Sequence, residues 1–441
     1  MNCAISQRVP NVPVVSKTSG LLFEKELIEK YILDYGKCPV TGGLLTMDDI
    51  IELKTSKVTD SKSAAPVLNT SSLSDDGKVA AEQSECLQFP DSIAEQITST
   101  CINLSQIRNS YRKISTSLAS VDAVRGYVFN NGYTLHQTTV PGVLSLDIEN
   151  SKEIIATGGA DTNAVVFHLS SGKTISTLSG HSEKVTSVKF GNEGDLVVTG
   201  SSDKTVRVWR RSEKGSYKCK DTLAHHTAEV RAVTIHPSQK YLVTASLDCS
   251  WQFYDLSSES RVAQVACGNG SERFSSAVFH PDGHIFGTCA SGLGLVRFWD
   301  VAKQDNILKL DAHSGPVTSI EFSENGYTLA TAAAAEDVKL WDLRFLRTIM
   351  TFRCDDISAQ TRSVDFDHSG RYLAIGGEQI SIYEIGASRC SIYEIDASRD
   401  PITTFSDMPA IGGVSCLKFG KDAEYVAAAG TSDSKLLLFR L

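Results

Sequence analysis

The chain has 441 residues, a formal net charge of −9 and 41% hydrophobic residues. This length suits roughly two or three domains, and the hydrophobic content is enough to build their cores. Charges of both signs are spread without long runs, so we expect neither a nucleic-acid groove nor a membrane-binding patch. No stretch approaches the ~18 apolar residues that are needed to span a bilayer.

The 11 cysteines are spread along the chain, and no two of them form a Cys-x-x-Cys pair. The N-terminus lacks the apolar segment of a secretory signal. An odd number of cysteines without paired spacing, together with this N-terminus, predicts free thiols in a reducing intracellular compartment.

Residues 1–55 predict a small α+β domain, in which a Ser-Gly hairpin turn precedes apolar residues at helical spacing. The helical set is Phe23, Leu27, Ile28, Tyr31 and Ile32, and the rest of the core is Leu44, Leu45, Ile50, Ile51 and Leu53. Two cysteines without a histidine cannot form a zinc site. We therefore expect no metal and no cofactor, with hydrogen bonds and salt bridges in their place.

Residues 56–91 are rich in Ser, Thr, Asp, Lys and Ala, which predicts a disordered linker. Residues 92–126 predict a helical connector. Its apolar residues Ile93, Ile97, Ile102, Leu104 and Ile107 suggest an amphipathic helix. The cations Arg108, Arg112 and Lys113 then suit a solvated helix face better than a nuclear-import signal.

Residues 127–441 contain one phrase seven times, in which an aromatic residue closes a strand at intervals of 42 to 56 residues. These aromatic residues are Phe167, Trp209, Tyr254, Trp299, Trp341, Tyr383 and Phe439. A period of about 40 to 45 residues, with Gly-His early and Trp-Asp late, is typical of WD40 blades. The predicted inner strands are 143–148, 185–190, 230–235, 275–279, 317–322, 363–366 and 414–419. The sequence thus predicts an all-β propeller of seven blades.

Closure of this ring needs a strand from elsewhere, because no residues follow the third strand of the last blade. The segment 133–136 resembles the outer-strand phrase 177–181, so we expect it to complete that blade and to remove two open sheet edges. The segments 381–390 and 391–400 match at eight of ten positions. We interpret this duplication as an inserted loop or as a second copy that competes for one strand position.

The second blade is predicted to contain one buried hydrogen-bond chain with a structural role. Its members are His181, Thr199 or Ser201 (of which we favour Ser201), Asp203 and Trp209. The corresponding turn acids of other blades are Asp161, Asp248, Asp337 and Asp433. A hydrolytic function for the His, Ser and Asp is not expected, because the carboxylate fixes the imidazole and the indole completes the network.

The N-terminal module carries the phrases Cys-Ala-Ile-Ser at 3–6, Pro-Val-Val at 13–15, Ser-Gly-Leu-Leu-Phe-Glu at 19–24, Leu-Ile-Glu-Lys-Tyr-Ile at 27–32 and Cys-Pro-Val-Thr-Gly at 38–42. Their order resembles a U-box, a zinc-free relative of the RING domain that recruits ubiquitin-conjugating enzymes. In front of seven WD40 repeats, this module resembles the pre-mRNA-processing factor 19 family. The resemblance covers residues 1–55 and 92–441.

The resemblance implies a RING-type (U-box) E3 ubiquitin transferase of the nucleus, within a spliceosome-associated complex and with roles in pre-mRNA splicing and DNA repair. By motif position, Ile5, Tyr31, Pro39 and Val40 would form an apolar groove for the ubiquitin-conjugating enzyme (E2), although packing within the module would also suit them. The U-box would position the E2–ubiquitin thioester without a covalent catalytic residue. The propeller would recruit protein substrates and splicing-complex subunits.

An alternative function is that of a non-catalytic WD40 scaffold, in a splicing or signalling complex, with a vestigial U-box. The family also implies a homotetramer, assembled through a coiled coil that follows the U-box. Residues 56–90 contain no repeat of apolar a and d positions, so we expect a monomer here.

Overall fold

The computed structural model describes residues 13–16, 22–25, 28–29, 32, 45–52, 89–110, 117–137, 142–267, 272–292, 294–334, 336–352, 363–385, 400–405, 413–430 and 435–440. The chain divides into two compact units, Met1–Glu82 and Gln83–Leu441, and each is described by itself. The predicted linker 56–91 lies outside the described residues except for its last three positions.

The N-terminal unit contains a three-stranded antiparallel sheet. Its central strand β1 (Pro13–Ser16) pairs with β2 (Leu22–Glu24) on one side and with β3 (Ile50–Glu52) on the other, and the short helix η1 (Met47–Asp49) precedes β3. The buried side chains of this unit form one cluster: Val14, Phe23, Ile28, Ile32 and Leu45. Phe23 was predicted on the helix, which is wrong, because it pairs with Val14 as part of β2.

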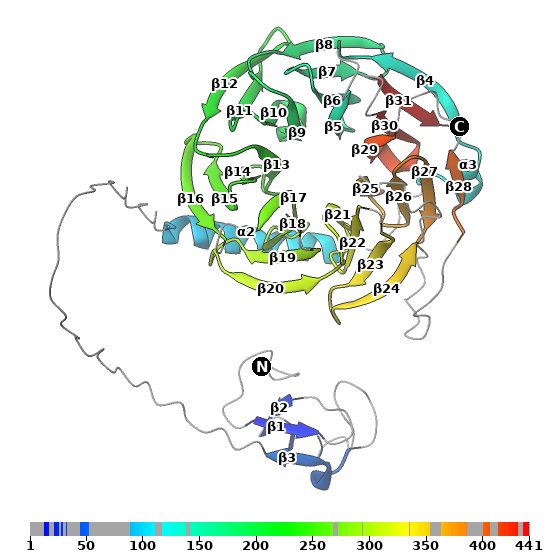
Figure 1. Cartoon of the computed structure of the whole chain (residues 1–441). Helices are drawn as coiled ribbons and strands as arrows, with labels where there is room; N and C mark the ends of the chain where they lie inside the picture. Colours follow the sequence, from blue (N-terminus) through cyan, green and yellow to red (C-terminus); the bar gives the residue numbers. More distant parts are fainter. Residues whose placement is uncertain are drawn as a thin grey trace, which may run out of the picture. The chain divides into compact units, whose positions relative to one another are not determined.

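The second unit contains seven four-stranded antiparallel sheets arranged radially around a common centre (Figure 1), which confirms the seven-bladed propeller. In each blade the first strand lies innermost. The first blade consists of β5 (Val143–Glu149), β6 (Ile154–Gly159), β7 (Ala164–His168) and β8 (Lys173–Leu178), and the second of β9 (Val185–Gly191), β10 (Leu196–Ser201), β11 (Val206–Arg211) and β12 (Tyr217–Leu223). The third blade consists of β13 (Val230–Ile235), β14 (Tyr241–Ser246), β15 (Ser250–Asp255) and β16 (Ser260–Ala266), and the fourth of β17 (Arg273–Phe279), β18 (Ile285–Ser291), β19 (Leu295–Asp300) and β20 (Asn306–Asp311). The fifth blade consists of β21 (Val317–Phe322), β22 (Thr328–Ala333), β23 (Val338–Asp342) and β24 (Arg347–Phe352), and the sixth of β25 (Ser363–Phe366), β26 (Tyr372–Gly376), β27 (Ile380–Glu384) and β28 (Thr403–Phe405). Short 3-10 helices η2 (Asn192–Gly194) and η3 (Lys421–Ala423) lie in turns between first and second strands.

The last blade closes the ring with a strand from the other end of the unit. Its strands β29 (Val414–Phe419), β30 (Tyr425–Gly430) and β31 (Lys435–Arg440) are completed by β4 (Val128–Thr134), which pairs antiparallel with β31. The closing strand therefore begins five residues before the predicted segment 133–136, and His136 lies beyond its end. The chain thus seals the ring by hydrogen bonds between segments about three hundred residues apart.

The strand alternation sets two faces of the propeller. Loops between blades and turns between second and third strands lie on one face, here called the upper face. Turns between first and second strands, and between third and fourth strands, lie on the opposite, lower face. The predicted inner strands are confirmed with bounds that differ by at most two residues. Second strands such as β10 are buried at every position, because each is covered by the sheets on both sides.

In the described part of the second unit, helices α2 and α3 precede β4, and α2 contacts the lower face. Helix α2 (Asp91–Ser110) buries Ile97 and Cys101 against side chains of the third and fourth blades, whereas α3 (Val121–Arg125) packs on the last two blades. The predicted apolar stripe of α2 is wrong in part, because Ile102 and Ile107 are exposed. A helix that rests on a ring through one narrow strip buries only residues about four apart. No helix among the described residues is long and apolar enough to span a bilayer.

The duplicated segment contributes one strand through its first copy. Residues 381–384 of this copy lie in β27, which pairs with β26 and β28. Residues 391–399 of the second copy lie outside the described residues, so the choice between an inserted loop and a competing strand stays open.

Candidate functional site

The predicted network of the second blade is centred on Thr199. The imidazole of His181 lies 2.9 Å from Asp203 Oδ2 through Nδ1 and 2.8 Å from Thr199 Oγ1 through Nε2, and the Trp209 indole donates to the same Thr199 oxygen at 2.9 Å. Ser201 instead donates to the carbonyl oxygens of Glu183 and Lys184. The preference for Ser201 is therefore wrong. This serine lies at the end of β10, where its hydroxyl donates to carbonyl oxygens of the neighbouring loop.

The directions of these hydrogen bonds follow from the carboxylate. Because ionised Asp203 can only accept, His181 Nδ1 carries the proton and Nε2 accepts from the Thr199 hydroxyl. Burial opposes ionisation of Asp203, but hydrogen bonds from Thr205, Ser182 and His181 outweigh it and lower the pKa of this carboxyl to about 2. Burial also lowers the pKa of His181, so the imidazole is neutral at pH 7. The chain of donors runs from Trp209 through Thr199 and His181 to Asp203.

The histidine, carboxylate and threonine of this network recur in three further blades, and in the fifth blade the Trp341 indole also donates to the threonine. His136, His226 and His313 each lie 2.8 to 3.0 Å from a turn carboxylate through Nδ1 and 2.8 to 2.9 Å from a second-strand threonine through Nε2. Their partners are Asp161 with Thr157, Asp248 with Thr244, and Glu336 with Thr331. In the fifth blade the carboxylate is Glu336 and not the predicted Asp337, since the longer side chain spans the turn. Asp433 lies outside the described residues.

These networks join the upper-face loops to the blades and do not form a catalytic site. Thr199 is fully buried, and its oxygen already accepts the Trp209 N–H, so it is not available as a nucleophile. Asp203 also accepts the Ser182 backbone N–H at 3.0 Å, which fixes the inter-blade loop to the turn. The role of this hydrogen-bond network is therefore to hold the inter-blade loop in a fixed orientation.

Charged side chains on the inner strands form a second group, which was not predicted from the sequence. Lys189 Nζ lies 3.0 Å from Asp147 Oδ1, and Lys418 Nζ pairs with Asp365 and, at 3.1 Å, with Glu321. Burial disfavours the charge of Lys418, but Asp365 and Glu321 outweigh it and raise the pKa of this ammonium. Each member is the next-to-last residue of a predicted inner strand, and this recurrence is the signal that could have revealed the group.

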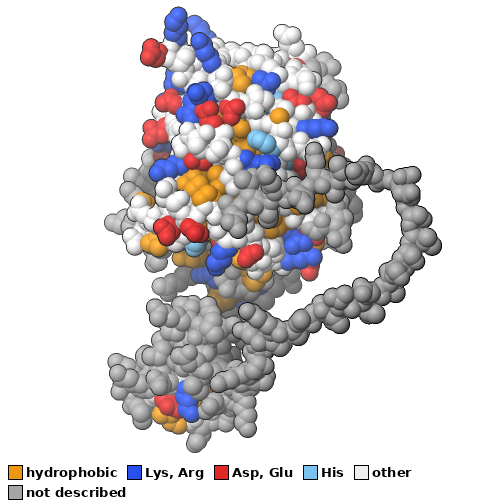
Figure 2. Space-filling view, turned by 90° about the vertical axis from the view of Figure 1, so that its left-hand side faces the viewer, with side chains coloured by type: hydrophobic (Ala, Val, Ile, Leu, Met, Phe, Trp, Pro, Cys, Tyr) orange, Lys and Arg blue, Asp and Glu red, His pale blue; other side chains and the backbone are white. Residues whose placement is uncertain are grey.

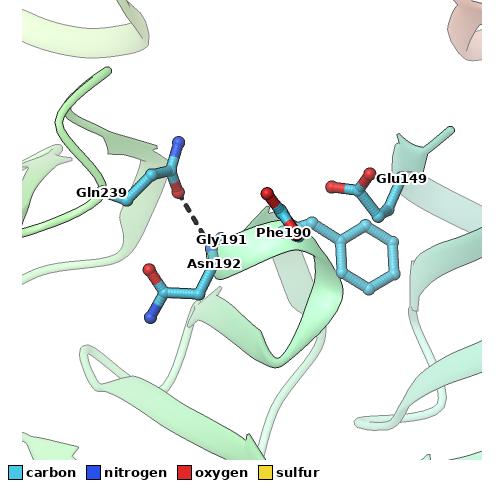
Figure 3. A pocket seen from close by; sticks show the side chains of 6 residues that line it. Glu149, Phe190, Gly191, Asn192 and Gln239 are labelled. Atoms are coloured by element: carbon cyan, nitrogen blue, oxygen red, sulfur yellow. Dashed lines mark hydrogen bonds between the residues drawn. The ribbon is translucent and has the colours of Figure 1, made fainter. Parts of the chain in front are cut away.

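A pocket of about 540 Å³ opens on the lower face, at the turns that follow the first strands of the first three blades. Figure 3 shows Glu149 beside the Phe190 ring, and Gln239 on the other side, where its Oε1 accepts the Asn192 backbone N–H at 2.9 Å. Glu193 also lines the pocket. Two carboxylates, two amides and an aromatic ring favour a cationic side chain over an anion. Among the described residues, no group of three or more His, Cys, Asp or Glu is placed to hold a metal ion.

The residues predicted for the E2 groove, Ile5, Tyr31, Pro39 and Val40, lie outside the described residues. Their arrangement stays a prediction. In the described part of the same unit, the Thr46 backbone N–H and hydroxyl both donate to Asp49 Oδ2, at 2.9 and 2.6 Å. This pair fixes the start of η1 through hydrogen bonds.

Known proteins resemble this chain both over the propeller and over the whole length. Residues 142–410, which span the first six blades from β5 to β28, match the family model of the IFT122 first beta-propeller. Pre-mRNA-processing factor 19 of Oryza sativa is 40% identical, with 100% of this chain and 97% of the rice protein covered. The chain belongs to the pre-mRNA-processing factor 19 family.

Other members of the pre-mRNA-processing factor 19 family give the same result. Pre-mRNA-processing factor 19 homolog 2 of Arabidopsis thaliana is 41% identical over 100% of this chain and 97% of that protein. The human pre-mRNA-processing factor 19 is 30% identical over 86% of this chain and 90% of the human protein. The alignment with the rice protein runs over 522 positions, more than the 441 residues present here, so the rice protein has residues that this chain lacks.

Proposed function

We propose that this chain is a RING-type E3 ubiquitin transferase that acts in pre-mRNA processing. One observation carries the proposal: the similarity to plant proteins named pre-mRNA-processing factor 19 extends over 100% of the chain and therefore includes the N-terminal module. A propeller alone would fit many functions, because this fold hosts many kinds of binding site. The N-terminal module is what favours ubiquitin transfer.

The described part of that module suits a U-box. A cluster of five buried apolar side chains packs around the sheet β2-β1-β3, and the pair Thr46 and Asp49 supplies a local hydrogen-bonded staple. In a RING-like domain without zinc, hydrogen bonds of this kind would help to support the small core in place of metal ligands. This supports the assignment, and the E2 groove itself is proposed from motif position.

In the proposed mechanism the N-terminal module binds the E2 enzyme through Ile5, Tyr31, Pro39 and Val40. It holds the E2–ubiquitin thioester where a substrate amine can attack it, so that rate enhancement comes from positioning and not from a covalent enzyme intermediate. The propeller recruits the protein substrate and the subunits of the processing complex. The proposed location is therefore the nucleus, where pre-mRNA is processed.

The surface of the propeller favours protein partners over nucleic acid. On the face drawn in Figure 2, Lys and Arg side chains are interspersed with Asp and Glu, without the continuous basic track that phosphate backbones select. The lower-face pocket adds carboxylates of Glu149 and Glu193. Together with the net charge of −9, these features suit contacts with basic or mixed protein surfaces.

A ubiquitination assay tests the proposal. Full-length chain is mixed with activating enzyme, a panel of E2 enzymes, ubiquitin and ATP, and ubiquitin chain formation is followed. Ile5→Ala and Pro39→Ala should abolish the activity, whereas Met47→Ala, at an exposed position of the same unit, should retain it. All four tryptophans lie in the propeller, so their fluorescence reports separately whether that unit stays folded.

The alternative scaffold function makes the opposite prediction. Wild-type chain that forms no ubiquitin conjugates with any E2 of the panel, while its propeller remains folded, would leave a non-catalytic WD40 scaffold. Full activity in both Ile5→Ala and Pro39→Ala would show that the groove lies elsewhere.

A further inference from the structure

The turn between the third and fourth strands of the fifth blade differs from its counterparts in the other described blades. The two residues at the tip of this turn are Ser171-Gly172 in the first blade, Lys214-Gly215 in the second, Ser258-Glu259 in the third, Lys303-Gln304 in the fourth and Phe345-Leu346 in the fifth. Four tips are small or polar, as expected for a solvated turn. The fifth blade alone among these five carries two large apolar side chains.

The backbone conformation of this turn is energetically unfavourable for Leu346. The second tip residue has a positive φ in all five turns: 64° at Gly172, 85° at Gly215, 55° at Glu259, 59° at Gln304 and 52° at Leu346. A left-handed conformation suits glycine and disfavours a bulky apolar residue. Leu346 is nevertheless 45% exposed and Phe345 62% exposed, so burial does not offset the strain.

Arginine and aromatic side chains continue from this turn to helix α2 as a stacked ladder. Arg347 lies 5.2 Å and Arg344 5.6 Å from the centre of the Phe345 ring. Arg344 and Arg108 each lie 5.1 Å from the centre of the Tyr327 ring, which joins the turn to the helix. At these distances each guanidinium is attracted to the face of the aromatic ring beside it. These attractions hold the side chains of the surface in one arrangement.

The carboxylates that accompany the ladder lie beneath it. Asp342 pairs with Arg344 at 2.6 Å and its side chain is 3% exposed, whereas the Arg344 side chain is 52% exposed. Asp282 pairs with Arg108 at 2.7 Å and is 13% exposed. Asp342 holds Arg344 through Nε and Nη2, and Asp282 holds Arg108 in the same way. The outward face therefore presents an apolar tip flanked by Arg344 and Arg347, although the chain as a whole is acidic.

We propose that Phe345 and Leu346, with Arg344 and Arg347 beside them, form a docking surface for a segment of a partner protein that carries both acidic and apolar side chains. Aromatic residues and arginine are the side chains most often responsible for binding energy at protein interfaces. Because Asp342 already holds Arg344 through Nε and Nη2, the charge that favours an acidic partner is mainly that of Arg347 beside Phe345. The proposal is independent of ubiquitin transfer and of the lower-face pocket.

The internal repeat supplies the variant that tests this surface. The double substitution Phe345→Ser with Leu346→Gly converts the tip into that of the first blade, Ser171-Gly172. Because glycine relieves the left-handed strain, which offsets the loss of the exposed contacts of Arg344 and Arg347 with Phe345, the melting temperature of this variant should stay close to that of the wild type. A loss of binding would then not result from unfolding. Ile307→Ser, at a 50% exposed apolar position on β20, is the matched control.

A phage-displayed library of random dodecapeptides is panned on the full-length chain, and the selected peptides are synthesised with a fluorescent label. We expect peptides that combine Asp or Glu with Leu or Phe. Their affinity, measured by fluorescence anisotropy, should fall roughly tenfold or more on the double variant, and should not change on Ile307→Ser. Arg347→Glu should also weaken binding, because it reverses a charge at the rim.

Several results would overturn the assignment. These are peptides that bind the double variant as well as the wild type, selected peptides without acidic residues, or no selected peptides at all. Binding of labelled oligouridine that the double variant abolishes would identify an RNA surface instead. Self-association in light scattering that the double variant abolishes would identify a contact between copies of this chain.

Discussion

Replacement of Thr199 by valine tests whether a single hydroxyl is the hydrogen-bond partner of both the His181 imidazole and the Trp209 indole. Valine keeps the shape of threonine and removes only the oxygen. The Trp209 N–H then loses its acceptor and His181 Nε2 loses its donor. Each buried polar group left without a partner costs about 1 to 3 kcal/mol, so we expect a loss of about 4 kcal/mol in the free energy of unfolding.

The fourth blade provides the matched control. Thr288 accepts the Trp299 indole N–H at 2.8 Å, but the residues 267–272 between the third and fourth blades contain no histidine. Thr288→Val therefore removes the partner of one group instead of two, at an expected cost of about 2 kcal/mol. For a propeller of about three hundred residues, these losses correspond to melting temperatures lower by about 6 °C and about 3 °C.

Calorimetry and circular dichroism of the two variants measure this difference without relying on the tryptophan signal. Equal costs for Thr199→Val and Thr288→Val would refute the reasoning, because they would mean that the His181 contact contributes nothing. A larger loss for Ser201→Ala than for Thr199→Val would place the centre of the network at Ser201 after all.

Three further predictions concern pH, the lower-face helix and the duplicated segment. Burial lowers the pKa of His236 to about 4, whereas the unfolded chain binds this proton near 6.5. The unfolded state therefore binds more protons as the pH falls between these values, and stability is lost. In denaturant titrations, the loss of unfolding free energy from pH 7 to pH 5 should be about 2 kcal/mol smaller for His236→Asn than for the wild type. Ile97→Ala should destabilise the second unit by about 2 to 4 kcal/mol in thermal unfolding, since Ile97 is fully buried, whereas the exposed Ile102→Ala should change it by less than about 0.5 kcal/mol. Deletion of residues 391–400 should leave the melting temperature unchanged, because the first copy already supplies β27, and a marked loss in that measurement would contradict this reasoning.

The strand pattern of the propeller was predictable because each blade repeats the same local signals. Apolar residues alternate along the inner strands, and an aromatic residue closes the third strand, so the period alone locates seven inner strands to within two residues. The closing strand was found from its resemblance to an outer-strand phrase. Its start was misplaced, because the exposed residues of β4 carry no apolar alternation.

The network residues were predictable as types and only partly as individuals. A threonine precedes the closing aromatic residue by ten or eleven positions in the first five blades, and this recurrence favours Thr199 over Ser201. The choice between Glu336 and Asp337 depends on how far each carboxylate reaches across a turn. That distance is set by the turn conformation, which the sequence pattern does not specify.

The sequence by itself determined the number of blades, their order and the family to which the chain belongs, because these depend on patterns within one repeat or one module. Only the tertiary structure decided which distant side chains meet. Arg108 and Asp282 are 174 residues apart in sequence, yet they pair at 2.7 Å beneath the ladder that ends at Phe345. Closure of the ring brings such groups together, and no local period records a contact that exists only once the blades are stacked.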